Sequence, residues 1–266
     1  ANLKWFTPRL AIGAPPEPRA YHSASRVGSA IYVFGGQRAK AQPLGDLQVF
    51  DLRAMAWTKA EARGAPPRPR YWHSSVHIEG KLFVIGGYAG GESLADLHVL
   101  DVEALHWSSP KLSGSPLPAL SSHTCTVVGQ RLYIYGGMSI ARDEAGDTRV
   151  AYQRDLHVVD LESLSAWRLR ARGEQPAARA YHESVLVGGY MLILGGWSGA
   201  AQPVGALPAL DLDGLGVWYS VEVPGSSPPP MYGHTATLIG SKVLLFGGWD
   251  GFSPTSSAHV LDTTAL

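Results

Sequence analysis

Histidine recurs at one fixed place along this chain, and imidazole is the side chain that most often binds metal ions or moves protons near neutral pH. One histidine stands thirteen residues before the first glycine of each of five Gly-Gly pairs, and the five are His22, His73, His123, His182 and His234. Equivalent positions around a common axis would bring five imidazoles together as a metal site. The alternative is that each histidine hydrogen-bonds a loop and fixes the start of a strand. We favour this structural role, because side chains facing each other across such an axis are too far apart for ligand distances of about 2.1 Å.

The other residues that could carry chemistry also have simpler explanations. Cys125 is the only cysteine, so the chain has no intramolecular disulfide framework, and the other copies of the repeat place Ala or Ser at this position. We expect a small, packed strand residue rather than a nucleophile. The sequence contains no Gly-Lys-Ser/Thr phosphate loop, no His-Glu-x2-His helix and no Gly-x-Ser-x-Gly elbow. We predict no catalytic residue, no metal ligand and no cofactor, and hence a protein that is not an enzyme.

The elements that position these residues form five copies of one unit. The Gly-Gly pairs recur at spacings of 51, 50, 59 and 52 residues, as Gly35-Gly36, Gly86-Gly87, Gly136-Gly137, Gly195-Gly196 and Gly247-Gly248. A run that reads Asp-Leu-x-Val-x-Asp follows each of the first three pairs. A tryptophan comes six or seven residues after the run in the first four copies. Positions that keep step over five copies indicate an internal repeat.

Each copy reads as four short strands. β-branched residues alternate after the histidine, and a run that is apolar on both faces, such as residues 31–34 or 82–85, then ends at the Gly-Gly pair. The Asp-Leu-x-Val run and the tryptophan segment supply the third and fourth strands. The 31 Gly and 19 Pro are also typical of many short strands joined by turns. The fourth copy has Ala206 and Pro208 in its third strand, and a proline inside a strand suits an edge position, so we expect irregular fourth and fifth copies.

This pattern resembles the kelch repeat, which is marked by a Gly-Gly pair closing the second strand, an Asp-Leu-containing third strand and a tryptophan in the last strand. The resemblance covers essentially the whole chain. The sequences before the first strands, such as Pro-Arg-Ala-Tyr-His at residues 18–22, are similar to those of kelch-domain-containing and Rab-effector proteins. No region resembles the helical BTB domain of other kelch adaptors. The resemblance implies an all-β kelch β-propeller of four-stranded antiparallel blades, with residues 1–266 forming a single propeller domain.

The number of blades has two readings. Five visible repeats predict a five-bladed ring, whereas kelch propellers commonly have six or seven blades, of which these five could be a part. The segment around Trp5 resembles a lone fourth strand, and the fifth copy stops after its third strand at Asp262. We therefore predict that the Trp5 segment pairs with the strand from His259 to Asp262 and covers its open edge.

Charge and hydropathy argue against two classes of partner. Lys and Arg number 22, as do Asp and Glu, so the formal net charge is zero and gives no sign of nucleic-acid binding. No apolar run approaches membrane-spanning length, so we expect no membrane insertion. The lone cysteine and the absence of an apolar signal core among the first residues predict a cytoplasmic location, with cytoskeletal association as an option.

The charged residues are unevenly spread and rich in arginine. Residues 1–179 hold 21 basic and 16 acidic residues, and Arg outnumbers Lys by 16 to 6 in the whole chain. Guanidinium groups suit bidentate binding of carboxylates. We expect some of these arginines in the loops between blades and others in an unusually long loop, residues 138–154, with aromatic residues beside them. The predicted partner-binding residues are Arg19, Arg70, Arg142, Arg149, Arg179, Tyr21, Trp72, Tyr152 and Tyr181.

Two alternatives stand beside this assignment. Arg19, Arg70 and Arg179 could instead form salt bridges with neighbouring loops, and the long loop could be a tolerated insertion. We predict a non-enzymatic scaffold or adaptor that binds a protein partner, through an acidic segment or a chain terminus, on the face of the second-to-third and fourth-to-first strand loops. Within this class, the options are a substrate receptor of a ubiquitin ligase, a cytoskeletal or trafficking adaptor, and a subunit of a large assembly. The option from another class is a small-molecule or sugar enzyme that uses the central pocket.

Overall fold

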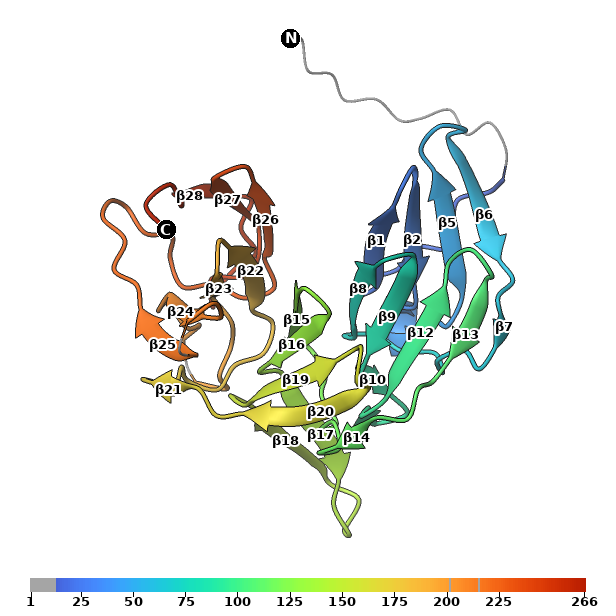
Figure 1. The fold of residues 1–266 in the computed structure, drawn as a ribbon, viewed down its shortest axis with the longest axis horizontal. Helices are drawn as coiled ribbons and strands as arrows, with labels where there is room; N and C mark the ends of the chain where they lie inside the picture. The colour runs from blue at the N-terminus through green and yellow to red at the C-terminus, as the bar shows by residue number, and fades with distance from the viewer. Residues whose placement is uncertain (1–12, 201, 215) are drawn as a thin grey trace. The chain divides into compact units, whose positions relative to one another are not determined.

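The protein is an all-β chain built from five blades, each an antiparallel sheet (Figure 1). The computed structural model describes residues 13–200, 202–214 and 216–266. Within these ranges the helical structure is one short 3-10 turn, η1 (Ala39–Ala41). The second strand of every blade ends immediately before its Gly-Gly pair, as the sequence predicts. The five-bladed all-β fold expected from the repeat is therefore confirmed.

The chain divides into two compact units, and the first comprises Ala1–Ile85 and Asp96–Pro110. It holds blades 1 and 2, in strand orders β1-β2-β5-β6 and β8-β9-β12-β13. Blade 1 consists of β1 (Ser23–Val27), β2 (Ala30–Phe34), β5 (Leu47–Asp51) and β6 (Ala56–Ala60), with the hairpin β3 (Gln37–Arg38) and β4 (Gln42–Pro43) beside η1. Blade 2 consists of β8 (Ser74–Ile78), β9 (Lys81–Ile85), β12 (Leu97–Asp101) and β13 (His106–Ser108), joined at its outer edge by β7 (Arg63–Gly64).

The second unit comprises Gly86–Ala95 and Lys111–Leu266 and holds blades 3 to 5. It includes the hairpin of β10 (Tyr88–Ala89) and β11 (Glu92–Ser93). Blade 3 consists of β15 (Thr124–Val128), β16 (Arg131–Tyr135), β19 (Leu156–Asp160) and β20 (Ser165–Leu169), with β14 (Ser113–Gly114) at its edge and the hairpin of β17 (Met138–Arg142) and β18 (Thr148–Tyr152). Blade 4 consists of β22 (Glu183–Val187), β23 (Tyr190–Leu194), β24 (Pro208–Asp211) and β25 (Val217–Ser220), with β21 (Arg172–Gly173) at its edge. Blade 5 consists of β26 (Thr235–Ile239), β27 (Lys242–Phe246) and β28 (Ala258–Asp262).

Three short edge strands, β7, β14 and β21, extend the outer edges of blades 2, 3 and 4. Each lies in the segment that leaves one blade and pairs in parallel with the fourth strand of the next, as Arg63 and Gly64 do with His106 and Trp107. In blades 2 and 4 the fourth-strand tryptophan packs onto the preceding blade. Trp107 lies 5.4 Å from Phe34, and Trp218 lies 5.3 Å from Tyr135, measured between ring centroids. The conserved spacing of tryptophan in the repeat thus produces apolar cores between blades.

The Gly-Gly pairs are required by close packing between blades. Gly136 has a φ of +64°, and a Cβ at this position would lie 2.8 Å from Cε1 of His182 and 2.7 Å from the carbonyl oxygen of Arg179. Gly35 and Gly195 face His73 and His234 in the same way. The missing side chain therefore leaves the space into which the histidine of the next blade packs.

Replacing Gly136 with Ala should destabilise the protein more than replacing Gly129, which serves as a matched control. Both glycines have positive φ values, but a Cβ at Gly129 meets nothing within 4 Å. Left-handed backbone geometry costs an alanine about 1 kcal/mol at either site. The clash at Gly136 adds about 1–2 kcal/mol, which chemical denaturation of both variants would measure. Equal losses of stability would show that the close approach to His182 does not matter.

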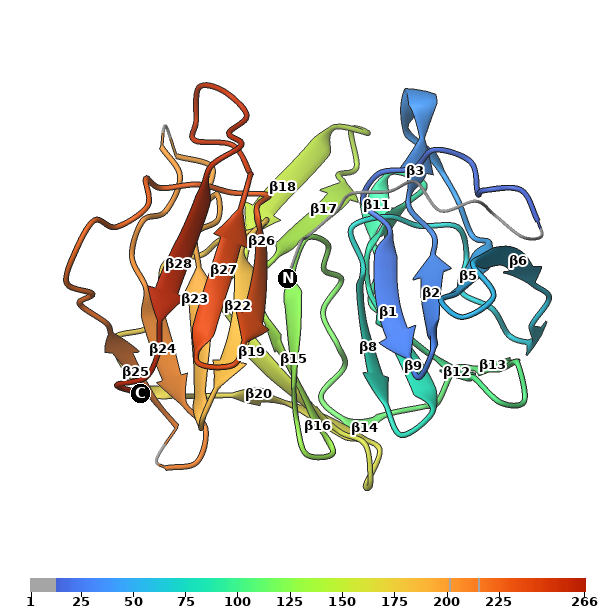
Figure 2. The same ribbon diagram turned by 90° about the horizontal axis from the view of Figure 1, so that it is seen from above.

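The fourth and fifth blades depart from the regular pattern. Pro208 begins the inner strand β24, where it pairs with Ser220, so the edge position expected for this proline is wrong. The first residue of a strand also tolerates proline. In blade 5 the described residues form three strands, with β28 outermost in the sheet (Figure 2). The segment around Trp5, expected to pair with β28, lies outside the described residues, so this pairing and the single-domain assignment stay predictions.

Candidate partner-binding face

Arg19 and Arg70 each make an internal fork to an aspartate of the same blade. The two terminal nitrogens of Arg19 lie 2.8 Å from the two carboxylate oxygens of Asp46, and a third bond reaches the carbonyl oxygen of Gly35 at 3.0 Å. Arg70 holds Asp96 in the same way at 2.6 and 2.7 Å, and its side chain is fully buried. Its guanidinium lowers the pKa of Asp96 against the opposing effect of burial. For both arginines the structure shows the salt-bridge alternative, so we leave them out of the proposed contact surface.

Arg179 occupies the equivalent place in blade 4 but has a different set of partners. It is 1% exposed, its Nε donates to the carbonyl oxygen of Ala177 at 3.1 Å, and its Nη1 donates to that of Gly195 at 3.0 Å. Among the described residues it has no carboxylate partner. Burial lowers the pKa of this guanidinium. The third predicted loop arginine is therefore buried without a counter-ion.

The repeat histidines pack between blades. Nε2 of His73 hydrogen-bonds Oγ of Ser23 at 2.8 Å, and Nε2 of His182 hydrogen-bonds Oγ1 of Thr124 at 3.0 Å. In each pair, the hydroxyl belongs to the residue after the histidine of the preceding blade. Burial lowers the pKa of His123 and of His234 to about 4, so these rings are neutral at pH 7. Within the described part of the chain, no group of three His, Cys, Asp or Glu side chains is placed to hold a metal ion.

The thiol of Cys125 lies on the first strand of blade 3, opposite Ile134. Burial raises its pKa to about 12. At neutral pH the group is therefore a protonated thiol, and only a thiolate is an effective nucleophile. This environment agrees with the packing role expected from the small residues at equivalent positions.

The aromatic residues of the inter-blade loops gather into two groups, one in each unit. In unit 1, Tyr21 lies 5.5 Å from Trp72, and Tyr71 lies 4.8 Å from Trp72, between ring centroids. In unit 2, Tyr232 lies 6.1 Å from Tyr181 and 5.2 Å from Trp197. Tyr21 is half exposed and Trp72 and Tyr181 are half-buried, so part of each group is available for contact.

The residue before each repeat histidine adopts a left-handed backbone conformation. The φ values lie between 53° and 65° at Tyr21, Trp72, Ser122, Tyr181 and Gly233. The amide of Tyr181 donates to the carbonyl oxygen of Ser122 at 3.1 Å, and that of Gly233 donates to Tyr181 at 2.8 Å. The left-handed conformation, supported by these hydrogen bonds, directs the aromatic side chains into the loops rather than along the strands.

The long loop of repeat 3 is an ordered hairpin rather than a structureless segment. Strands β17 and β18 pair from Met138 with Tyr152 to Arg142 with Thr148, and the hairpin extends beyond the rest of blade 3 (Figure 1). Asp143 closes the turn, because its carboxylate accepts the amides of Ala145 and Asp147. The hairpin thus has a defined shape, with many exposed residues on both strands.

The predicted hairpin residues have different environments. Arg149 pairs with Asp143 at 2.7 Å, yet its side chain is 74% exposed. Arg142 is exposed and lies over Gly91, where a Cβ would come within 3.2 Å of its Nε. Tyr152 is half-buried beside Gly199 of blade 4. The base of the hairpin also contacts the Arg179 loop, since the amide of Arg179 donates to the carbonyl oxygen of Gln153 at 3.0 Å.

The predicted partner-binding residues therefore fall into three kinds. Arg142 and Arg149 are exposed on the hairpin, the aromatic side chains are partly exposed beside the loops, and Arg19, Arg70 and Arg179 are buried. The pairing of the loop arginine with a specific aspartate was not predicted from the sequence. Its signal was present, as copies 1 and 2 both have Arg three residues before the histidine and Asp ten or eleven residues after the first glycine.

Four-stranded blades closed by Gly-Gly pairs, with tryptophan packed between blades, define a kelch-type β-propeller. The chain matches the family model described as the KLHDC2/KLHL20/DRC7 Kelch-repeats domain over residues 1–196 and again over residues 122–266. The chain belongs to this kelch-repeat family, and the resemblance noted in the sequence is confirmed.

Curated relatives share part of this chain. The Rab9 effector protein with kelch motifs from Rattus norvegicus is 45% identical over 89 residues, which are 32% of this chain and 24% of that protein. The protein of the same name from Homo sapiens is 44% identical over 89 residues, which are 32% of this chain and 24% of that protein. Acyl-CoA-binding domain-containing protein 5 from Arabidopsis thaliana is 30% identical over 249 residues, which are 90% of this chain and 28% of that protein. The aligned part of this chain thus spans about a quarter of each of these relatives.

The described residues contain no helix that is long and apolar enough to cross a membrane.

Proposed function

We propose that this chain is a non-enzymatic interaction domain that binds a segment of a partner protein on the face formed by the hairpin β17–β18 and the inter-blade loops of unit 2. The observation that carries the proposal is the hairpin itself. It is ordered by pairing along both strands, yet it presents Arg142 and Arg149 to solvent. Arginine and aromatic side chains supply most of the binding energy at protein interfaces. Unit 2 contains both, in the arginine hairpin and in the group of Tyr181 and Tyr232.

The chemistry of the hairpin favours an acidic partner segment. The exposed guanidinium groups can form charge-assisted forks with carboxylates, and the aromatic group of unit 2 offers apolar contact. The name of the Rab9 effector relatives supports a trafficking partner within this class. A cytoplasmic adaptor, with the substrate-receptor and cytoskeletal roles as further options, is the setting we propose.

Reversing the hairpin charges should selectively weaken partner binding. We expect the double variant Arg142→Glu/Arg149→Glu to bind its partner at least tenfold more weakly, since a desolvated arginine contact is worth about 2 kcal/mol. Arg53→Glu/Lys242→Glu is a matched control, because both residues are exposed. Each also lies at the end of its blade that is opposite to the Gly-Gly pair. Quantitative affinity purification of the three proteins at two salt concentrations measures the effect. Equal recovery of partners by the hairpin variant and the control would exclude this face.

A further inference from the structure

The unpaired charge of Arg179 stands out when the blades are compared. In blade 1, Arg19 lies sixteen residues before Gly35, and Asp46 lies eleven residues after it. In blade 4, Arg179 lies sixteen residues before Gly195, and Ala206 lies eleven residues after it. Leu47 begins the third strand opposite Phe34, and continuing the register of β23 with β24 places Leu207 opposite Leu194. Ala206 therefore occupies the place of Asp46.

The other blades lack this mismatch. Blade 3 has Asp155 at the acidic position but Leu120 three residues before its histidine, and Asp155 pairs instead with Arg168 at 2.7 Å. Blade 5 has neither group, since Met231 and Ser257 stand at the two positions. Blade 4 alone keeps the arginine after the carboxylate is lost.

The guanidinium of Arg179 keeps the contacts of Arg19 except those to the acid. The bonds from Nε and Nη1 to carbonyl oxygens are the same in both residues. Nη2 of Arg19 donates to Asp46 at 2.8 Å, whereas Nη2 of Arg179 makes no hydrogen bond to any described residue. The arginine is thus held in place with one edge free, and a buried cation without a counter-ion is costly.

A second unpartnered donor lies in the same neighbourhood. The hydroxyl of Tyr135 is buried and has no hydrogen-bond partner in the described part of the chain. Burial raises the pKa of Tyr135 to about 12, against the opposing effect of the nearby Arg179 charge, so the hydroxyl is neutral and keeps its proton. Both groups favour an incoming anion.

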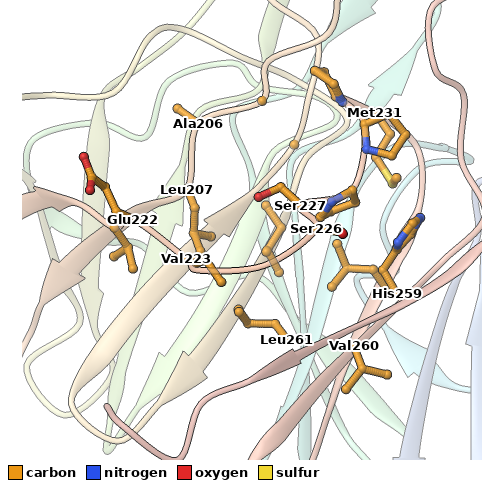
Figure 3. Close-up of a pocket in the computed structure, with 18 of the residues that line it drawn as sticks. Ala206, Leu207, Glu222, Val223, Ser226, Ser227, Met231, His259, Val260 and Leu261 are labelled. Carbon is orange, nitrogen blue, oxygen red and sulfur yellow. The ribbon is translucent and has the colours of Figure 1, made fainter.

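A cavity adjoins the position that lacks the carboxylate. In blade 1 the side chain of Asp46 is 21% exposed and borders a cavity of about 440 Å³. In blade 4 a larger cavity of about 740 Å³ is lined by both Gly195 and Ala206, the counterparts of the two residues that Arg19 contacts. Figure 3 shows Ala206 and Leu207 on one side of this cavity and His259 of β28 on the other.

We propose that Arg179 receives a carboxylate from a partner at the place that Asp46 and Asp96 fill in blades 1 and 2. The ligand class is a carboxylate, supplied by an acidic side chain or by a chain terminus. The inference rests on the proposed function, because it adds a buried anchor beside the hairpin that makes the outer contacts. It explains why an arginine is retained where its internal counter-ion is absent.

The variant Ala206→Asp tests the site by restoring the internal partner. We expect it to raise the melting temperature, because the new carboxylate can fork with Arg179 as Asp46 does with Arg19. Ala206→Asn is the matched control, since it fills similar space without the charge. A melting temperature of Ala206→Asp at or below that of Ala206→Asn would overturn the inference.

Small carboxylates provide the binding measurement. Sodium acetate should stabilise the wild-type protein more than sodium chloride at equal ionic strength, and Ala206→Asp should weaken this response at least tenfold. Equal responses to the two salts in the wild-type protein would refute the site. Should Ala206→Asp fail to fold, Arg179→Gln provides the second test and must abolish the acetate response.

Two peptides separate the sources of the carboxylate. One has a central aspartate with both ends blocked, and the other has glycines only with a free carboxyl terminus. Binding of the first assigns a side-chain ligand, binding of the second assigns a terminus, and binding of neither overturns the inference.

Partner capture then separates this inference from the proposed function. If the hairpin variant no longer binds the partner but Ala206→Asp does, binding at the hairpin face is supported and carboxylate binding at Arg179 is refuted. Loss with Ala206→Asp but not with the hairpin variant gives the reverse result.

Discussion

Arg70→Ala lowers the free energy of unfolding by about 3 kcal/mol, the lower end of the loss expected for a buried ion pair, because the side chain of Asp96 is 34% exposed. The side chain of Arg70 is fully buried and its two terminal nitrogens hold the carboxylate of Asp96. Removal leaves that carboxylate without its cation and opens a cavity between the loops. Chemical denaturation of the purified variant measures the loss.

Two controls make this result specific. Arg142→Ala removes an arginine whose side chain is exposed, so the stability of the protein should change by less than about 0.5 kcal/mol. Asp96→Asn keeps the shape of the partner and removes its charge, and we expect an intermediate loss. If Arg70→Ala were as stable as Arg142→Ala, the internal fork would not support the blade.

Glu183→Gln should stabilise the protein at neutral and alkaline pH. Burial raises the pKa of Glu183 to about 7, from an ordinary value near 4.5. The folded protein therefore holds this proton more tightly than the unfolded chain does between these values. Stability from this group is complete below about pH 4.5 and is lost as the pH rises through 7. The shift corresponds to at most about 3 kcal/mol, which the glutamine variant should recover at pH 8.

The position of Glu183 supplies a second variant for this test. It follows His182 as Ser23 follows His22 and Thr124 follows His123, and both hydroxyls bond the histidine of the next blade. The ring nitrogens of His234 have no hydrogen-bond partner among the described residues. Glu183→Thr should therefore restore that bond as well as remove the charge.

Melting temperatures from pH 5 to pH 8.5 separate this effect from that of the histidines. His123 and His234 have lowered pKa values, so their contribution is present above pH 6.5 and is lost on acidification. Glutamine at position 183 should flatten the alkaline side of the profile alone. The melting temperature of the wild-type protein should fall more between pH 5 and pH 8 than that of Glu183→Gln. An equal fall in both proteins would contradict the role of Glu183.

The repeat made most of the fold predictable. Gly-Gly pairs, the histidine thirteen residues earlier and the Asp-Leu strand each specify a local geometry, and five copies of that geometry leave few alternatives. The prediction for Pro208 was wrong because proline, which has no amide N–H, is tolerated at two places in a sheet. One is an edge strand, and the other is the first residue of any strand, which Pro208 occupies in β24. The hairpin β17–β18 was not predicted either, because only the length of the loop was considered. Its strand pairing depends on the turn that Asp143 closes.

The candidate site was less predictable, because an arginine suits an internal carboxylate as well as an external one. Arg19, Arg70 and Arg142 are alike in composition and differ in what stands opposite them in space. Only the fold brings Asp46 to Arg19 and leaves Ala206 near Arg179. The burial of Glu183 is likewise a property of the packed blades, since glutamate in a short strand carries no signal of its own.

The left-handed residue before each histidine has a consequence for how far this protein has been optimised for stability. Glycine adopts this conformation at little cost, and Gly233 shows that the scaffold accepts it. Tyr21, Trp72 and Tyr181 keep large side chains there at a strain of about 1 kcal/mol or more each. The contacts of Trp72 with Tyr21 and Tyr71 and of Tyr181 with Tyr232 offset part of this strain. Replacing these residues with glycine would relieve the strain but would also remove the ring contacts between the loops.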